Sequence, residues 1–248
     1  MKLYVAKLLG TLAGALLLAG CGQGEAPKAP PTQTASDVIN APPEIPAMGQ
    51  ERDILALGDS LFTGYGLPSD QAYPVKLEAA LRARGINARI SNAGVSGNTS
   101  AEGLSRLAFT LQSQQRPPDL VLISLGGNDM LRGLPPGQTR TNLDAILSEL
   151  KKRKIKVVVM GMLAPPNMGP DYRAQFDPMY PALTTQYDAV LVPFFLQAVQ
   201  GRPDLVQQDH IHPTKEGIEA IVAATVDQVA GALPKTDDAK TGALPPPR

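Results

Sequence analysis

The sequence predicts an α/β domain in which a parallel β-sheet carries helices on both faces. Between residues 53 and 233, short apolar runs alternate with longer stretches whose apolar residues recur every three or four positions. This alternation of strand and helix patterns is typical of a parallel sheet. The run "DLVLISLG", residues 119–126, is almost wholly apolar, which indicates a strand that is buried on both faces.

Five segments have the apolar character and the length of buried strands. The first run, "DILALGD", ends in Gly and Asp, and the last, "AVLVPF", is shorter than the others. In chain order, the predicted strands are residues 53–59, 86–92, 119–126, 155–161 and 189–194.

The predicted helices lie between these strands and have recognisable capping residues. In the first, residues 70–84, apolar residues recur at intervals of four, and Gly85 stands where a C-terminal cap belongs. The second begins with Thr99 and Glu102 in capping-box spacing. The remaining helices are predicted around residues 140–153, near residues 171–186 and after Pro213.

Composition and charge limit the classes of function. The 248-residue chain has 23 basic and 23 acidic residues, so its formal net charge is zero. No basic stretch interleaved with aromatic residues is visible, so nothing indicates a nucleic-acid partner. A single cysteine excludes an intrachain disulfide and a cysteine-based zinc site, and two histidines disfavour a histidine-rich metal site. We therefore expect any catalysis to need no metal and no other cofactor.

The first 20 residues have the pattern of a secretory signal peptide. Two lysines flank the start of an uncharged, mostly apolar run from Leu8 to Ala19, which is too short to cross a bilayer about 30 Å thick as a helix. The segment "LAGC", which ends at Cys21, resembles a bacterial lipobox, in which the cysteine is acylated and becomes the mature N-terminus. The alternative is an ordinary secretory signal in which Cys21 is incidental.

Segments rich in Pro, Ala and small polar residues flank the predicted domain, and this composition is typical of disordered chain. An acylated Cys21 implies a lipid-anchored protein of the cell envelope. Because Gly22 rather than Asp follows the cysteine, the outer membrane or the periplasmic face is favoured. The predicted organisation is a signal peptide at 1–20, a tether at 21–50, a folded domain at 51–233 and a tail at 234–248.

Polar, glycine-rich segments follow most of the predicted strands, where the active sites of parallel sheets form. Because the carboxyl ends of parallel strands meet at one edge of the sheet, we expect these segments to converge there. They are "GDSLFTGYG" after the first strand, "NAGVSGNTS" after the second, "GGNDM" after the third and "DHIHP" after the fifth.

These segments hold the groups that a serine needs to hydrolyse an ester or a thioester. Ser60 directly follows a strand and is the candidate nucleophile. His210 and His212 are the only histidines, so only they can supply an imidazole base. Asp209 lies three residues before His212, a span that lets its carboxylate fold back onto the ring. The spacing therefore selects His212 as the base and leaves His210 as a bystander.

Candidate donors for a developing oxyanion are also present. Gly94 can bring a bare backbone N–H close to a substrate oxygen, Asn128 offers an uncharged amide, and Ser60 adds its own N–H. Each segment taken alone reads as an ordinary turn or helix cap. Their joint occurrence, in order and at the ends of predicted strands, favours an active site.

The segments "LGDSLFTGYG", "NAGVSGNTS", "GGND" and "DHIHP" resemble the sequence blocks of the GDSL, or SGNH, hydrolases. The resemblance covers the predicted domain and is closest to the bacterial branch of arylesterases, acyl thioesterases and lysophospholipases. It implies a flavodoxin-like three-layer α/β/α sandwich with a five-stranded parallel sheet. It also implies Ser60, Asp209 and His212 as the catalytic triad, and Ser60, Gly94 and Asn128 as the oxyanion hole.

The resemblance extends to substrate. The segment "MLRGLPPGQ" resembles a loop that covers the acyl chain, so Met130, Leu131, Leu134 and Pro135 are expected to line an acyl groove, with simple loop packing as the alternative. The implied function is a monomeric serine esterase that hydrolyses small-molecule acyl esters or lipids, with arylesterase, lysophospholipase or thioesterase activity. The alternatives are a carbohydrate O-deacetylase and a non-catalytic surface lipoprotein. The apolar loop argues against the first, and the complete triad against the second.

Overall fold

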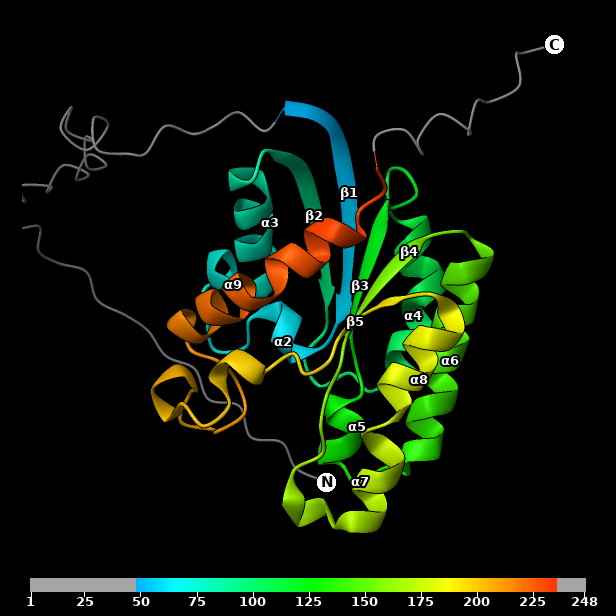
Figure 1. Cartoon of the computed structure of the whole chain (residues 1–248), viewed down its shortest axis with the longest axis vertical. Coiled ribbons are helices and arrows are strands. Elements are labelled where there is room, and N and C mark those ends of the chain that lie inside the picture. Colours follow the sequence, from blue (N-terminus) through cyan, green and yellow to red (C-terminus); the bar gives the residue numbers. More distant parts are fainter. Residues whose placement is uncertain (1–47, 236–248) are drawn as a thin grey trace, which may run out of the picture. The chain divides into compact units, whose positions relative to one another are not determined.

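The computed structural model describes residues 48–235, and in them a five-stranded sheet lies between two layers of helices (Figure 1). All neighbouring strands are parallel, and their order across the sheet is β2-β1-β3-β4-β5. The predicted three-layer α/β fold is therefore confirmed. The predicted signal peptide, Cys21 and almost all of the predicted tether and tail lie outside the described residues. The strands are β1 (Met48–Gly58), β2 (Ile86–Gly94), β3 (Leu120–Ser124), β4 (Lys156–Met160) and β5 (Val190–Val192).

The central strand β3 is buried along its whole length, because helices cover both of its faces and β1 and β4 pair with its edges. Its sequence is accordingly apolar up to Ser124. β1 begins at Met48, which is five residues before the predicted start and inside the segment predicted as a tether. The other strands begin within a residue of their predicted positions.

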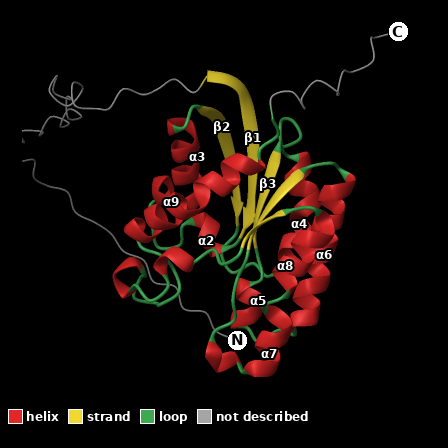
Figure 2. Ribbon diagram, viewed as in Figure 1, coloured by secondary structure: helices red, strands yellow, loops and turns green. Residues whose placement is uncertain are grey.

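Helices cover both faces of the sheet (Figure 2). On the first face, α3 (Tyr73–Ala83) packs against α9 (Lys215–Ala232), so an early and a late part of the chain lie side by side. On the second face, α6 contacts both of its neighbours. This second layer consists of α4 (Ser100–Gln112), α6 (Pro136–Lys152) and α8 (Met179–Tyr187).

The predicted capping residues are confirmed. Thr99 accepts a hydrogen bond from the backbone N–H of Glu102, whose carboxylate accepts one from the N–H of Thr99, so the capping box is complete. Gly85 follows the C-cap of α3 with φ of +81°, in the left-handed region that favours glycine. α9 begins at Lys215, with Thr214 as its N-cap.

The predicted single helix near residues 171–186 is wrong. The structure has two helices there, α7 (Pro170–Phe176) and α8, and the break falls at Asp177 and Pro178. Pro178 has no backbone N–H and cannot continue the hydrogen-bond ladder of α7. The carboxylate of Asp177 instead accepts a hydrogen bond of 2.8 Å from the N–H of Ala164, which fastens the break to the loop after β4.

Two short helices directly follow strands and were not predicted: α2 (Ser60–Thr63) after β1 and α5 (Gly127–Leu131) after β3. Both lie at the carboxyl ends of the strands (Figure 1). Among residues 48–235, no helix has the length and apolar character needed to cross a membrane. Single turns of 3₁₀-helix occur at Ser69–Gln71, Pro166–Met168, Gln197–Val199 and Pro203–Leu205.

Candidate active site

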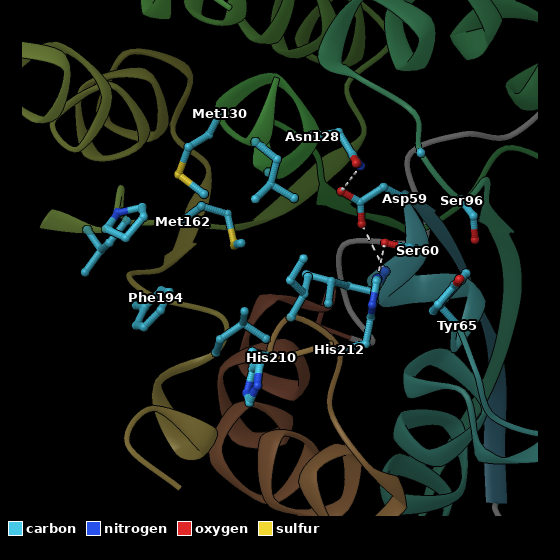
Figure 3. A pocket seen from close by; sticks show the side chains of 18 residues that line it. Asp59, Ser60, Tyr65, Ser96, Asn128, Met130, Met162, Phe194, His210 and His212 are labelled. Atoms are coloured by element: carbon cyan, nitrogen blue, oxygen red, sulfur yellow. Dashed lines mark hydrogen bonds between the residues drawn. The ribbon is translucent and has the colours of Figure 1, made fainter. Parts of the chain in front are cut away.

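The candidate nucleophile Ser60 is the first residue of α2, at the carboxyl end of β1. Asp59 caps this helix by accepting a hydrogen bond of 3.0 Å from the N–H of Leu61. The cap turns the chain sharply at the end of the strand and leaves the Ser60 hydroxyl in the pocket that Figure 3 shows. There Ser60 Oγ lies 2.8 Å from Nε2 of His212, a distance suited to proton transfer.

Asp209 meets the other side of the same imidazole. Its Oδ2 lies 2.6 Å from Nδ1 of His212, and its Oδ1 accepts the backbone N–H groups of Ile211 and His212 at 2.9 and 3.0 Å. Burial raises the pKa of Asp209, but the hydrogen bonds from His212 and Ile211 outweigh it and lower that pKa to about 2. Asp209 is therefore ionised at neutral pH and can fix the tautomer of the ring and favour its protonated form.

His210 differs from His212 in both conformation and contacts. Its φ of +59° lies in the left-handed region, and this reversal of the chain lets the carboxylate of Asp209 reach back to His212. His210 is exposed and lines the pocket, but no hydrogen bond joins its ring to another of the described residues. The structure thus brings His212, and not His210, to Ser60 and Asp209.

Gly94 does not reach the pocket, so the structure does not place it in an oxyanion hole. Its N–H donates to Oδ1 of Asn92 at 2.9 Å. A Cβ at Gly94 would lie 2.7 Å from the backbone N of Thr63 and 3.0 Å from the carbonyl O of Asp59. The glycine is therefore required for close packing between the end of β2 and α2, and not for contact with a substrate.

Gly97, three residues further on, lines the pocket in place of Gly94. Its φ of +81° favours glycine, and its carbonyl accepts a hydrogen bond of 2.7 Å from Arg132. No hydrogen bond joins the N–H of Gly97 or of Ser60 to another group in the described part of the chain. These two backbone donors are therefore free to meet an oxygen in the pocket.

Asn128 lies on α5 and lines the same pocket. Its Nδ2 donates to Oδ2 of Asp59 at 3.2 Å (Figure 3) and to the carbonyl of Asn98 at 3.1 Å. Both contacts are near the long end of the range for N–H···O bonds. The amide is thus oriented before any substrate binds, and an oxyanion would have to compete for one of its hydrogens.

Asp59, which lines the pocket, and Arg106, which does not, support this arrangement. Burial raises the pKa of Asp59 to about 6, although hydrogen bonds from Leu61 and Asn128 and the charge of His212 act to lower it. Arg106, on α4, donates to the carbonyls of Gly58 and Ala93 and to Oδ1 of Asn98 at 2.7–2.8 Å. The guanidinium thereby ties the ends of β1 and β2 to the loop that holds Asn128.

The pocket is a cavity of about 500 Å³ with a mainly apolar wall, within the range typical of small-ligand sites. Met130 and Leu131 line it as predicted, whereas Leu134 and Pro135 do not. Leu134 is held in a turn, because its N–H donates to the carbonyl of Asp129 and its own carbonyl accepts the hydroxyl of Tyr172. Pro135 is exposed just before α6.

Most of the apolar wall comes from residues that the sequence analysis did not assign to the pocket. Most of them follow the ends of β4 and β5, where the rule that sites form at the carboxyl ends of strands could have found them. The other two, Leu61 and Ile211, lie within segments already singled out for the nucleophile and the base. The wall residues missed are Leu61, Met162, Leu163, Pro165, Phe194, Leu196 and Ile211.

Within residues 48–235, no group of three or more His, Cys, Asp or Glu side chains is arranged to hold a metal ion. The acidic residues at the pocket are otherwise engaged, because Asp59 caps α2 and Asp209 binds His212. The groups that remain for chemistry are the Ser60 hydroxyl, the His212 ring and the backbone and amide donors around them.

Comparisons with known proteins identify the family. Residues 56–220 match the sequence profile described as the GDSL-like Lipase/Acylhydrolase family. The chain is 40% identical over 163 residues to an arylesterase of Vibrio mimicus, which covers 66% of this chain and 80% of that protein. It is 38% identical over 163 residues to thioesterase 1/protease 1/lysophospholipase L1 of Escherichia coli (strain K12), which covers 66% of this chain and 76% of the relative. The crystal structure of AlinE4, an SGNH-hydrolase family esterase, is 59% identical, with a TM-score of 0.64 over 76% of this chain and 100% of that chain.

Proposed function

This chain belongs to the GDSL-like Lipase/Acylhydrolase family, and on that premise we propose that it is a serine esterase that hydrolyses carboxylic esters through Ser60, His212 and Asp209. One observation carries the assignment of residues. The imidazole of His212 lies 2.8 Å from the Ser60 hydroxyl and 2.6 Å from the Asp209 carboxylate, at an apolar pocket. This is the arrangement that activates a serine for acyl transfer.

The first half of the reaction forms an acyl-enzyme. His212 takes the proton of Ser60 as Oγ attacks the acyl carbonyl, and Asp209 stabilises the imidazolium. The N–H groups of Ser60 and Gly97, with the Asn128 amide, donate to the oxyanion of the tetrahedral intermediate. As the intermediate collapses, His212 returns the proton to the leaving oxygen, and the alcohol departs.

The second half releases the acid. A water molecule takes the place of the alcohol, gives a proton to His212 and attacks the acyl carbon. The same donors hold the second oxyanion, and the proton then returns to Ser60 Oγ as the acyl group leaves. Neither half requires a metal or a cofactor.

The apolar wall supports an acyl group larger than acetyl. Met130, Met162 and Phe194 lie on the same side of the pocket, away from Ser60 (Figure 3). Burying a methylene group against such a wall stabilises a complex by about 0.8 kcal/mol. A carbohydrate O-deacetylase would have little use for this surface, and we do not favour that alternative.

The test is hydrolysis of p-nitrophenyl butyrate by the wild-type protein and by Ser60→Ala. We expect the wild type to turn over and to be labelled covalently by a fluorophosphonate, and Ser60→Ala to lose nearly all activity and all labelling. Ser69→Ala, on the exposed turn that follows α2, is the matched control and should behave like the wild type. Retained turnover in purified Ser60→Ala would contradict the assignment.

We further propose that acylated Cys21 anchors the enzyme in the cell envelope. The support is the signal-peptide pattern that ends in "LAGC" and the absence of any other cysteine. Several acyl chains on one residue would bind a membrane stably, whereas a single chain binds only marginally. In a bacterial host, Cys21→Ala should move the protein from the membrane fraction to the soluble fraction. An unchanged distribution would contradict the anchor.

A further inference from the structure

Two loops carry the proposed nucleophile and base. The first is residues 60–67, which follow β1 and begin with the four-residue helix α2, and the second is residues 207–213, which precede α9. Within the described part of the chain, hydrogen bonds join these loops at two points. One is the contact between Ser60 and His212, and the other is a bond of 2.8 Å from Nε2 of Gln207 to the carbonyl of Tyr65.

Both amide hydrogens of Gln207 help to hold the loops. Its Nε2 also donates to the carbonyl of Pro213 at 2.9 Å, so both amide hydrogens have acceptors. Its backbone N–H donates to the carbonyl of His212 at 2.7 Å. One residue therefore binds the carbonyls of the base and of the residue after it, and links them to the loop of the nucleophile.

The loop of the nucleophile is shaped to receive this amide. Gly66 has φ of +76°, and a Cβ there would lie 2.3 Å from Oε1 of Gln207. Any side chain at position 66 would therefore displace Gln207, in addition to the strain of a left-handed backbone. The close approach indicates a built contact and not an incidental surface bond.

Tyr65 connects the contact to the imidazole itself. Its ring lies against the ring of His212, with a centroid distance of 4.5 Å and an interplanar angle of 32°. Tyr65 is 52% exposed, so packing in the core does not hold the ring there. Its backbone does, because its N–H donates to the carbonyl of Ser60 at 3.2 Å and its carbonyl accepts from Gln207.

We propose that Gln207 is a positioning residue for the base: it fixes the distance between Ser60 and His212, and it holds the Tyr65 ring against one face of the imidazole. This inference rests on the proposed function. Proton transfer depends steeply on geometry, and a displacement of about 1 Å can cost about 100-fold in rate. Since Gln207 does not line the pocket, its loss should affect the chemical step and not the binding of substrate.

The experiment compares Gln207→Ala and Gln207→Glu with the neighbouring control Gln208→Ala. Gln208 is exposed, and no side-chain hydrogen bond joins it to the described residues. We would measure kcat and KM for p-nitrophenyl butyrate, with kcat expressed per active site titrated by a fluorophosphonate. Dividing by the number of titrated sites removes the contribution of unfolded protein. A residue with a merely structural role would change the unfolded fraction and leave kcat per site unchanged.

We expect Gln207→Ala to lower kcat per site by about tenfold or more, with KM within about twofold of the wild type. Gln207→Glu keeps the length but places a carboxylate opposite two carbonyls, so its loss should be at least as large. A kcat per site equal to that of Gln208→Ala, or a change confined to KM, would overturn the positioning role while the esterase assignment stands. A wild-type protein with no turnover and no labelling would instead remove the proposed function.

Tyr65 provides a second test should Gln207→Ala fail to fold, because an exposed side chain can be truncated at little cost in stability. Tyr65→Phe keeps the ring against His212, and Tyr65→Ala removes it. We expect kcat per site in Tyr65→Phe to exceed that in Tyr65→Ala by about fivefold or more. Equal values would show that the ring does not position the base and would overturn this part of the proposal.

Discussion

Asp59 is a carboxylate with 3% of its surface exposed, next to the proposed nucleophile Ser60. Burial raises its pKa from 3.8 to about 6, so between these values the folded protein holds a proton that the unfolded chain has lost. The free energy of unfolding must therefore fall as the pH rises through this range. Asp59 caps α2 and orients Asn128, but its ionisation lowers the free energy of unfolding. This loss reaches its full size above about pH 6.

Asp59→Asn should remove this pH dependence. Asparagine keeps the shape of the side chain and an acceptor for the N–H of Leu61, but it does not titrate. We expect the free energy of unfolding of the wild type, relative to the variant, to fall by up to about 3 kcal/mol between pH 4 and pH 6.5. Urea denaturation of both proteins across this range measures it. A difference that does not change with pH would contradict the raised pKa.

Asn128 donates its amide hydrogens to Asp59 and Asn98, so an oxyanion has to compete for one of them. If the amide turns to the oxyanion as the transition state forms, Asn128→Ala should lower kcat by about 10²–10³ and leave KM nearly unchanged. Asn167→Ala, at an exposed position outside the pocket, is the control. A kcat within about threefold of the control would leave Ser60 and Gly97 as the donors.

At the scale of elements, the pocket is a product of loops that lie far apart in the sequence. Its wall comes from the residues after β1, β2, β3, β4 and β5, each of which delivers a short segment to the same edge of the sheet. The sheet thus fixes the ends of these segments. Their side chains decide how much of an acyl group is removed from water.

This wall predicts the dependence on acyl chain length. While each added methylene still enters the pocket, kcat/KM for p-nitrophenyl esters should rise by about fourfold per methylene from acetate to butyrate. The rise should stop once the chain extends past the wall. Steady-state rates over an even series from acetate to decanoate measure this. A strict preference for acetate would instead favour the carbohydrate O-deacetylase that the sequence left as an alternative.

The elements show what the sequence could and could not predict. Strands and caps depend on residues close together in the sequence, so all five strands, the capping box at Thr99 and the cap at Gly85 were predicted. Only the start of β1 was placed five residues too late. The break between α7 and α8 was missed, although Pro178 signals it, because the apolar period continues across it. The short helices α2 and α5 follow strands so closely that no periodic pattern can mark them.

At the scale of the whole molecule, the site could be predicted only where spacing along the chain decides geometry. Asp209 and His212 are three residues apart, and few backbone conformations of so short a span would keep the carboxylate away from the ring. The choice between Gly94 and Gly97 depends on where β2 ends and how it packs on α2, which the sequence does not reveal. Leu134 was misplaced for the same reason, because Tyr172 in α7 holds its turn.

The separation of 152 residues between Ser60 and His212 has a consequence for synthesis. A ribosome makes β1 and the nucleophile early, but Gln207, Asp209 and His212 come only after β5. The base loop is then held in place by α9, which packs on α3 from the first half of the chain. An incomplete chain that lacks His212 therefore carries Ser60 without its proposed base.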